Sequence, residues 1–440
     1  MISQVLFFML MVAVSSMKAD DITYSENPKD RDSLSIHEGI VCTEAKTINY
    51  YKNGNTVATI QLSDPVKVAQ ADRVEPWGYF QFPSISKTDK GMLFVSWQMA
   101  EDSHKMYGKE NRAFMMSKDE GVTWASQDND YFLLTRDNSV ILNDGSTLGV
   151  CISSPPDISR YGNIQHPIGK WREYSYYRMD DLPDELQGVY FVQKTKGGHD
   201  DIFHAKLNDP GYLRYAIEDL MPIVWWGDIK QLSDHSLLAG MYPAIYEDSL
   251  GKVLPCCVSF YRSKDKGRSW DAVGKIPFRP DGIADRCGEW SFTEPSFEIL
   301  ADSTLLCVMR SGSMSPMYMS FSSDFGATWS DPQPFTPNGV KPRLMLLKNG
   351  VLVLASGRPG VQIRFSFDGS GRSWSDPIEM IPFMNDDESS IQTVSCGYSS
   401  IIENDNTSFF IAYSDFTTKD SLNNERKTIW CRKVTVTQYE

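Results

Sequence analysis

The sequence predicts an all-β fold, a six-bladed β-propeller with Asp-box hairpins, because it contains two internal repeats. The first repeat is a short turn phrase, SSDFGATW at residues 322–329, with similar phrases at 117–124, 263–270 and 366–374. We call these phrases Asp boxes. The second repeat is a pair of apolar strands joined by a polar turn, which occurs six times. Together they describe one supersecondary unit repeated along the chain.

Each Asp box has the chemistry of a tight hairpin turn. In the copy at 322–329, Asp324 can accept hydrogen bonds from nearby backbone N–H groups, and Gly326 can take the positive φ that such a turn needs. Trp329 has a large apolar body to bury and an indole N–H that needs one acceptor. The motif is therefore architectural, and its recurrence at one spacing indicates a repeat fold.

The longer repeat supplies the inner hairpin of each predicted sheet. An Asp box follows the first, third, fourth and fifth copies, where the outer hairpin of the same sheet would fall. Sheets arranged radially leave only short, protected edges, so the pattern favours a propeller. The six copies are residues 83–97, 139–153, 228–242, 295–310, 342–358 and 399–413.

The first twenty residues, MISQVLFFMLMVAVSSMKAD, predict a secretory signal peptide. Their apolar core of about ten residues is too short to span a bilayer, and small residues follow it. Cleavage is expected after Ser16 or Ala19. We therefore expect a secreted or periplasmic protein.

The chain divides into three expected segments. Residues 1–19 are the signal peptide, residues 20–75 form a β segment that closes or edges the propeller, and residues 76–440 form the propeller itself. The polar stretch at 158–220 fits a long insertion in the second blade better than a separate domain.

Charge and composition exclude several classes of partner. The formal net charge of −14 and the pI near 5.0 argue against nucleic acid or an anionic membrane surface as a partner. An anionic ligand would need a local cluster of arginines. The eight cysteines are expected to be buried strand residues and not a disulfide framework. The six histidines show no metal-like spacing, so neither a metal nor another cofactor is expected.

The four Asp boxes, the six hairpins and the residues at the hairpin ends resemble the sialidase (exo-α-neuraminidase) superfamily over roughly residues 75–435. In FTEPSFEILADSTLLCVMRS, Glu294 opens the fourth inner hairpin and Arg310 closes it; Tyr398 opens the sixth. The resemblance implies that Tyr398 is the nucleophile and Glu294 its base. A neutral phenol deprotonated by a neighbouring Glu can attack the anomeric carbon of a sugar acid without charge repulsion.

The resemblance also implies a set of arginines that holds the substrate's carboxylate. Arg310 and Arg358 match two of them, with Arg364 and Arg343 as rivals of Arg358. Where the family has a first arginine, in a Phe/Tyr-Arg-Ile-Pro phrase, this chain has Gln81. A glutamine there weakens carboxylate anchoring by about 1–3 kcal/mol. Either the substrate is not an ordinary sialoside, or another cation fills the gap: Arg73, Arg136 or Arg343.

The general acid is expected in the loop QMAEDSHKMYGKENR after the first inner hairpin. We choose Asp102, with Glu101 and Glu110 as alternatives. Tyr242 resembles the aromatic residue that lines the pocket for the sugar's glycerol side chain. Further apolar walls could come from Trp97, Trp225, Trp226 and Met241.

These residues predict a retaining exo-glycosidase that removes terminal sialic acid or a related acidic sugar from a glycoconjugate. One alternative is a hydrolase or lyase acting on another acidic glycan, the lyase using a histidine at the rim together with Tyr398. The other is a carbohydrate-binding propeller without turnover. A glycan is the expected partner in every case.

Overall fold

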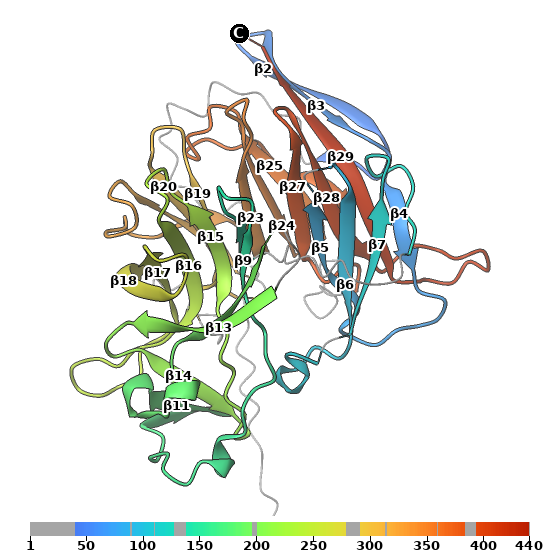
Figure 1. Ribbon diagram of the computed structural model, residues 1–440. Helices are drawn as coiled ribbons and strands as arrows, with labels where there is room; N and C mark the ends of the chain where they lie inside the picture. The colour runs from blue at the N-terminus through green and yellow to red at the C-terminus, as the bar shows by residue number, and fades with distance from the viewer. Residues whose placement is uncertain are drawn as a thin grey trace, which may run out of the picture.

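The computed structural model describes residues 40–88, 90–109, 111–126, 138–195, 200–278, 291–312, 315–358, 360–382 and 393–439. These residues fold almost entirely into β-strands, and the helices among them are 3-10 turns of three residues each (Figure 1). The all-β prediction is therefore confirmed. The expected signal peptide lies outside the described residues.

All six predicted inner hairpins are present as antiparallel strand pairs. In chain order they are β5 (Tyr79–Lys87) with β6 (Leu93–Met99), β8 (Ser139–Ile141) with β9 (Thr147–Val150), β15 (Trp226–Gln231) with β16 (Leu237–Ala244), β19 (Thr293–Ile299) with β20 (Leu305–Arg310), β23 (Val340–Leu346) with β24 (Leu352–Gly357), and β27 (Ser399–Asp405) with β28 (Ser408–Asp415).

Further strands extend each hairpin on its outer side. They are β7 (Arg112–Ser117), β12 (Val189–Lys194) and β13 (Asp200–Asn208), β17 (Cys257–Ser263) and β18 (Ser269–Ile276), β21 (Met317–Ser322) and β22 (Gln333–Thr336), β25 (Val361–Ser366) and β26 (Ile378–Ile381), and β29 (Thr428–Gln438). The second and third sheets join through a parallel pairing of β13 with β18.

The innermost strands follow one another as neighbours around the fold. β5 lies against β27, β27 against β23, β23 against β19, β19 against β15, and β15 against β8. This succession is that of a β-propeller, which confirms the predicted class. The number of six blades remains a prediction.

Three of the Asp boxes form the turns between the third and fourth strands of their sheets, and the box at 117–124 follows β7, the last strand of the first sheet. In the third sheet, Asp265 accepts hydrogen bonds from the backbone N–H of Ser269 (2.9 Å) and from its hydroxyl (2.6 Å). The N–H of Gly267 donates to the Ser263 hydroxyl (2.8 Å), and the indole of Trp270 donates to the Gly267 carbonyl (3.0 Å). Nearly the same bonds recur in the other three boxes. These hydrogen bonds join residues within the same box, so the sequence of the box is enough to specify the turn.

The box glycines also bring neighbouring sheets together. Gly267 has φ +87°, and a methyl group added there would lie 2.7 Å from Cδ2 of Leu148 in the second sheet. In the fourth sheet, Gly326 approaches Phe260 of the third, and the Trp329 ring stacks on Phe260 with centroids 4.2 Å apart. Glycine is thus required both for the turn and for the close packing between sheets.

The first strand, β1 (Ile40–Val41), pairs parallel with β26 of the fifth sheet, and the next three strands meet the C-terminal strand in one sheet, at the upper right of Figure 1. There β3 (Asn55–Leu62) and β4 (Val66–Gln70) pair antiparallel with the C-terminal strand β29, and β2 (Lys46–Lys52) extends β3. The buried guanidinium of Arg432 donates to the carbonyls of Cys42, Glu44 and Ser63 at 2.5–2.9 Å. These bonds fix the N-terminal segment to the last strand.

The stretch at 158–220 differs from the expected insertion. Its strands β12 and β13 are the outer half of the second sheet, so part of the stretch belongs to the propeller. The remainder forms a small antiparallel sheet of β10 (Gly169–Trp171), β11 (Tyr174–Arg178) and β14 (Leu213–Ile217), at the lower left of Figure 1. Polar residues alternate with buried ones along β13, which made the stretch look irregular in sequence.

Seven cysteines fall within the described residues, and none of these forms a disulfide. Six are buried, as expected, and Cys151 is partly exposed. Burial raises the pKa of the Cys256 and Cys431 thiols, so both stay protonated at neutral pH. No described helix is long and apolar enough to cross a membrane.

Candidate active site

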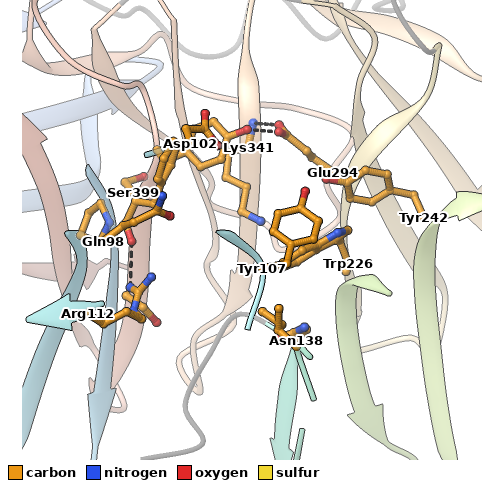
Figure 2. A pocket seen from close by; sticks show the side chains of 16 residues that line it. Gln98, Asp102, Tyr107, Arg112, Asn138, Trp226, Tyr242, Glu294, Lys341 and Ser399 are labelled. Atoms are coloured by element: carbon orange, nitrogen blue, oxygen red, sulfur yellow. Dashed lines mark hydrogen bonds between the residues drawn. The ribbon is translucent and has the colours of Figure 1, made fainter. Parts of the chain in front are cut away.

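A pocket of about 220 Å³ opens where the inner strands begin. Its lining comes from all six inner hairpins or the segments beside them, so it occupies one end of the central axis (Figure 2). The lining residues are Phe82, Pro83, Ser84, Gln98, Asp102, Tyr107, Arg112, Asn138, Ile152, Trp226, Gly227, Tyr242, Glu294, Lys341, Tyr398 and Ser399.

Three of these residues occupy equivalent, strained positions. Phe82, Glu294 and Lys341 have φ of +51°, +48° and +47°, and each directly precedes a proline at the entrance of an inner strand. The strand register shifts at each of them, so each lies in a β-bulge. A positive φ costs a residue with a side chain about 1–2 kcal/mol. Strain of this kind collects at functional sites, where it re-aims side chains.

Tyr398 and Glu294 meet inside the pocket. The Tyr398 hydroxyl donates a hydrogen bond to Oε1 of Glu294. Arg310 Nη1 donates to the same carboxylate oxygen at 2.9 Å and lies 3.4 Å from the Tyr398 hydroxyl. The other carboxylate oxygen accepts the backbone N–H of Lys341 at 2.9 Å. The structure thus brings the two residues within reach of proton transfer, with Arg310 beside both.

The surroundings push the two pKa values apart. Burial alone would raise the pKa of the Glu294 carboxyl, but the charges of Arg310 and Lys341 and the hydrogen bond from Tyr398 hold it below its ordinary value. Burial, together with the Glu294 charge, raises the pKa of Tyr398 well above its ordinary value. At neutral pH the pair is a carboxylate and a protonated phenol, which is the starting state of a base and the nucleophile it activates.

Lys341 was not predicted from the sequence. Its ammonium lies 5.8 Å from the centre of the Tyr398 ring, and its side chain reaches into the pocket in Figure 2. One signal could have found it. Lys341–Pro342 repeats the pattern of Glu294–Pro295, so a functional residue directly before a strand-opening proline recurs in the next sheet.

Gln81 does not line the pocket. The expectation that it binds substrate from the first sheet was therefore wrong. Its side chain is fully buried, and its Oε1 accepts the backbone N–H of Gly78 at 3.1 Å. Positive φ values at both Phe80 and Phe82 turn Gln81 away from the pocket and present Phe82 instead. The Phe82 ring meets Tyr398 edge-on, with centroids 5.0 Å apart.

An unpredicted arginine of the same sheet lines the pocket. Arg112 begins β7, and its Nη2 donates to the Phe82 carbonyl (3.0 Å) and to the Ser96 hydroxyl (3.2 Å). The strand pairing places Gln81 opposite Gln98, and Gln98 opposite Arg112. The sequence contains no motif that marks Arg112. Its place became clear only from the pairing of the strands in the structure.

Arg358 lies behind the pocket and is not part of its lining. It is 5% exposed and packs against Gly397, where an added methyl group would lie 2.7 Å from Cγ of Arg358. Because Gly397 directly precedes Tyr398, the Arg358 charge still acts on the Tyr398 phenol and on Glu294. Arg358 therefore affects the pKa values of Glu294 and Tyr398 through its charge, but it does not contribute to the surface of the pocket.

The other candidate arginines that the structure describes do not line the pocket, whether they were proposed for the missing charge or as rivals of Arg358. Arg343 Nη1 pairs with the buried carboxylate of Asp228 at 2.7 Å, in a partly buried ion pair between inner strands. The Arg73 side chain is 76% exposed and pairs with Glu75. Arg364 is buried within β25 and does not line the pocket. Arg136 lies outside the described residues.

Asp102 lines the pocket from the loop after β6. Its Oδ2 accepts the indole N–H of Trp77 at 2.9 Å, which fixes the direction of the carboxylate. Glu101 is exposed and does not line the pocket, and Glu110 lies outside the described residues. Downstream in the same loop, Gly108 packs against the 153–154 backbone, where a methyl group would lie 2.3 Å from the Ser154 nitrogen.

Aromatic side chains form another wall of the pocket. Tyr242 lines it as expected, together with Trp226 and with Tyr107, which was not predicted. The Tyr107 and Trp226 rings meet edge-on with centroids 5.8 Å apart, and they lie side by side in Figure 2. The remaining candidates for this wall are buried in cores instead: Trp97, Trp225 and Met241.

Known proteins are similar to this chain in one family model and in fold. Residues 225–411 match the family model for a BNR repeat-like domain. A protein of unknown function from Dyadobacter fermentans has 16% identity over 85% of this chain and 99% of that one, with a TM-score of 0.54. A Hadza microbial sialidase has 14% identity over 87% of this chain and 71% of that one, with a TM-score of 0.49.

A Penicillium chrysogenum α-L-arabinanase complexed with arabinobiose is also similar in structure, at 14% identity over 86% of this chain and 98% of that one, with a TM-score of 0.48. No curated protein sequence matches the chain. At such identities the structural likeness shows the fold alone. The described residues thus have the fold of a β-propeller, and residues 225–411 match a BNR repeat-like domain, in agreement with the repeats found in the sequence.

Proposed function

We propose that this protein is a retaining exo-glycosidase that removes a terminal sialic acid or a related acidic sugar from a glycoconjugate. The observation that carries the proposal is the hydrogen bond from the Tyr398 phenol to the Glu294 carboxylate, with Arg310 beside both. A tyrosine paired with a carboxylate in a pocket is the arrangement of sialidases that use a tyrosine nucleophile. The pocket also holds a second carboxylate, Asp102, which supplies a separate acid.

In the first step, Glu294 takes the phenolic proton and the Tyr398 oxygen attacks the anomeric carbon. The bond from that carbon to the leaving oxygen breaks, and Asp102 gives its proton to the leaving oxygen. In the second step, the Asp102 carboxylate takes a proton from water, the water oxygen attacks the same carbon, and the tyrosyl bond breaks. Glu294 then returns its proton to Tyr398. Two inversions give net retention.

Arg310 sets up the first step electrostatically. Its charge keeps Glu294 ionised at neutral pH, so that the carboxylate is ready to accept a proton. When the proton moves, negative charge leaves Glu294 and appears on the Tyr398 oxygen, which also lies beside Arg310. The cation therefore stabilises both the starting and the transferred charge.

The test is hydrolysis of aryl glycosides of sialic acid, glucuronic acid and rhamnose by the wild type and Tyr398→Phe. We expect turnover of an acidic glycoside and loss of about three orders of magnitude or more in kcat for the variant, as for removal of a nucleophile. Tyr50→Phe is the matched control, since it removes a buried hydroxyl on β2, at the opposite edge of the sheet from β27, and should keep full activity. Equal activity of Tyr398→Phe and wild type would contradict the mechanism.

The alternatives lead to different outcomes of the same experiment. A lyase using a histidine at the rim finds no support in the described lining, which contains no histidine. A lyase would still reveal itself by an unsaturated product. A binding propeller without turnover would bind a sugar acid but hydrolyse none of the glycosides.

A further inference from the structure

We propose that Trp77 is a positioning residue, which holds the Asp102 carboxyl group in the direction from which it gives its proton to the leaving oxygen. Gln81, buried in β5 of the first sheet, supports the backbone that carries Trp77. Neither residue lines the pocket, so both act through Asp102. Asp102 is the acid only under the function proposed above, on which this inference rests.

The Asp102 carboxylate depends on a residue outside its own loop. Asp102 is exposed, in the loop that follows β6. Among the residues that the structure describes, Trp77 is the hydrogen-bond partner of this side chain, and its indole N–H donates to Oδ2 at 2.9 Å. An exposed aspartate has several rotamers of similar energy, and a hydrogen bond to a fixed donor favours one of them. Oδ1, the second carboxylate oxygen, is then left to carry the proton.

The Trp77 ring is fixed by two aromatic neighbours. It meets the rings of Phe82 and Phe416 edge-on, with centroids 6.3 Å and 6.4 Å away. This geometry is a favourable one for aromatic pairs. Phe82 lines the pocket and meets Tyr398, and Phe416 directly follows β28 of the last sheet. Because the ring is held between the first and the last sheet, its N–H keeps one direction.

The backbone on both sides of Trp77 is fixed as well. The Lys427 ammonium donates to the carbonyl of Pro76 at 2.6 Å. The N–H of Gly78 donates to the side-chain oxygen of Gln81 at 3.1 Å, in the interior of the sheet. A buried N–H without an acceptor is costly, so Gln81 stabilises this conformation of the chain. Gln81 therefore acts on the acid from behind the pocket.

The segment that carries the tryptophan touches the acid loop directly. Gly78 has φ +96°, and a methyl group added there would lie 2.6 Å from the backbone nitrogen of Asp102 and still closer to the carbonyl oxygen of Ala100. Only glycine allows such an approach. From the other side, Gln98 Nε2 donates to the carbonyls of Ala100 (3.1 Å) and Glu101 (3.3 Å). The start of the acid loop is thus held between two segments of the first sheet.

The direction of the Asp102 carboxyl group decides how well it works, because a proton donor must lie within hydrogen-bond reach of the oxygen that it protonates. Without the bond from Trp77, the carboxyl group stays in the pocket but turns away from the leaving oxygen more often. The loss in rate should therefore be smaller than the loss on removing the carboxyl group. It should also be confined to substrates whose leaving group needs a proton.

The experiment measures kcat and KM on the methyl and nitrophenyl glycosides of N-acetylneuraminic acid and of glucuronic acid. The proteins are the wild type, Trp77→Phe, Asp102→Asn and the double variant. Trp77→Phe keeps an aromatic ring and removes the N–H. Trp124→Phe is the matched control, because the partly buried Trp124 also donates its indole N–H to one acceptor, the Gly121 carbonyl at 3.1 Å, and does not line the pocket.

We expect Trp77→Phe to lower kcat about tenfold on the methyl glycoside and about twofold or less on the nitrophenyl glycoside, with KM nearly unchanged. Adding this change to Asp102→Asn should cost nothing further, because Trp77 acts through the carboxyl group that the variant lacks. Trp124→Phe should behave as wild type. Gln81→Met removes the acceptor of the Gly78 N–H and should show the same preference for the better leaving group, which keeps the test open if Trp77→Phe does not fold.

Equal losses of Trp77→Phe on both glycosides would overturn the inference, and so would a loss that adds fully to that of Asp102→Asn. If the wild type hydrolyses none of the glycosides, the proposed function fails, and the contact is tested by fluorine NMR of the full chain labelled with 5-fluorotryptophan. Asp102→Ala should then shift the Trp77 resonance, which is assigned by its absence in Trp77→Phe, and leave that of Trp124 in place. An unmoved Trp77 resonance would show that Trp77 does not hold Asp102.

Discussion

The phenol of Tyr398 and the carboxylate of Glu294, 104 residues apart in the sequence, share a hydrogen bond at the mouth of the propeller. Each stands at the start of the inner hairpin of its own sheet, and the fold brings these starts to one end of the central axis. Arg310, from the end of the same hairpin as Glu294, completes the contact. The nucleophile and the base that we propose, and the charge beside them, therefore come from two sheets and need no further element to align them.

The pair predicts a pH-dependent contribution to stability. The pKa of Glu294 is lowered from its ordinary 4.5, so the unfolded chain binds the proton more readily than the native protein. Glu294 therefore stabilises the fold fully above pH 4.5, and this contribution is lost as the pH falls through the lower, native pKa. Glu294→Gln leaves Arg310 without its charged partner and should lower the free energy of unfolding at pH 7 by about 3 kcal/mol.

Urea unfolding of both proteins at pH 7, and at the lowest pH where both still unfold cooperatively, measures this effect. The difference between them should shrink on acidification. A difference that grows as the pH falls would show that Glu294 is protonated in the native protein.

Gln81→Arg tests the corrected position of the first-sheet residue. Because Gln81 is fully buried and accepts the Gly78 N–H, an arginine there would place a charge without a partner in the interior. We expect a loss of about 3 kcal/mol or more in the free energy of unfolding, with no gain in affinity for a sugar acid. Thermal melting and titration with the acid check both parts. Tighter binding with unchanged stability would mean that residue 81 reaches the pocket.

Two glycine substitutions separate backbone strain from packing between sheets. Gly267 and Gly350 have nearly the same φ, +87° and +89°, but an added methyl group at Gly350 meets nothing within 4 Å. Gly350→Ala should therefore cost only the strain of a positive φ, about 1–2 kcal/mol. Gly267→Ala should cost about 1–3 kcal/mol more, since its methyl group would press on Leu148 of the second sheet. If both variants lower the melting temperature by the same amount, the contact of Gly267 with the second sheet does not contribute to stability.

Asp102→Asn distinguishes an acid from a residue that only binds substrate. A substrate with a good leaving group, such as a nitrophenol, needs little protonation, whereas an alkyl or sugar leaving group needs much. We expect the variant to lose about 10²–10⁴-fold in kcat on the poor leaving group and far less on the nitrophenyl glycoside. Glu101→Gln is the control and should keep both rates. Equal losses on both substrates would remove Asp102 from the role of acid.

The sequence predicted the local features of the fold well, for a physical reason. An Asp box closes on itself, as Asp265 does with Ser269 four residues later, so its structure depends on neighbours in the chain. The inner hairpins likewise join strands separated by short turns. Features that depend on distant pairing were harder to predict. Strands β12 and β13 looked like part of an insertion, because their place is set by pairing with β9 and β18.

The candidate site was predicted in part for the same reason. Tyr398, Glu294 and Arg310 lie in motifs that the resemblance could match one by one, and the structure brings them together. Gln81 was placed in the pocket by matching the family's Phe/Tyr-Arg-Ile-Pro phrase, but a matching phrase does not fix the direction of a side chain where the strand is irregular. Positive φ at the two phenylalanines beside Gln81 makes the strand irregular there, and Phe82 lines the pocket instead of Gln81.

The nucleophile is the central claim, and it is tested most directly by trapping the glycosyl-enzyme. A fluorinated, activated analogue of the acidic sugar that the protein hydrolyses slows the second step more than the first, so the covalent intermediate accumulates. Mass spectrometry of the intact protein and of its peptides should show one added glycosyl group on Tyr398 in the wild type and none in Tyr398→Phe. An adduct on Glu294, on Asp102 or on any residue outside the pocket would contradict the account.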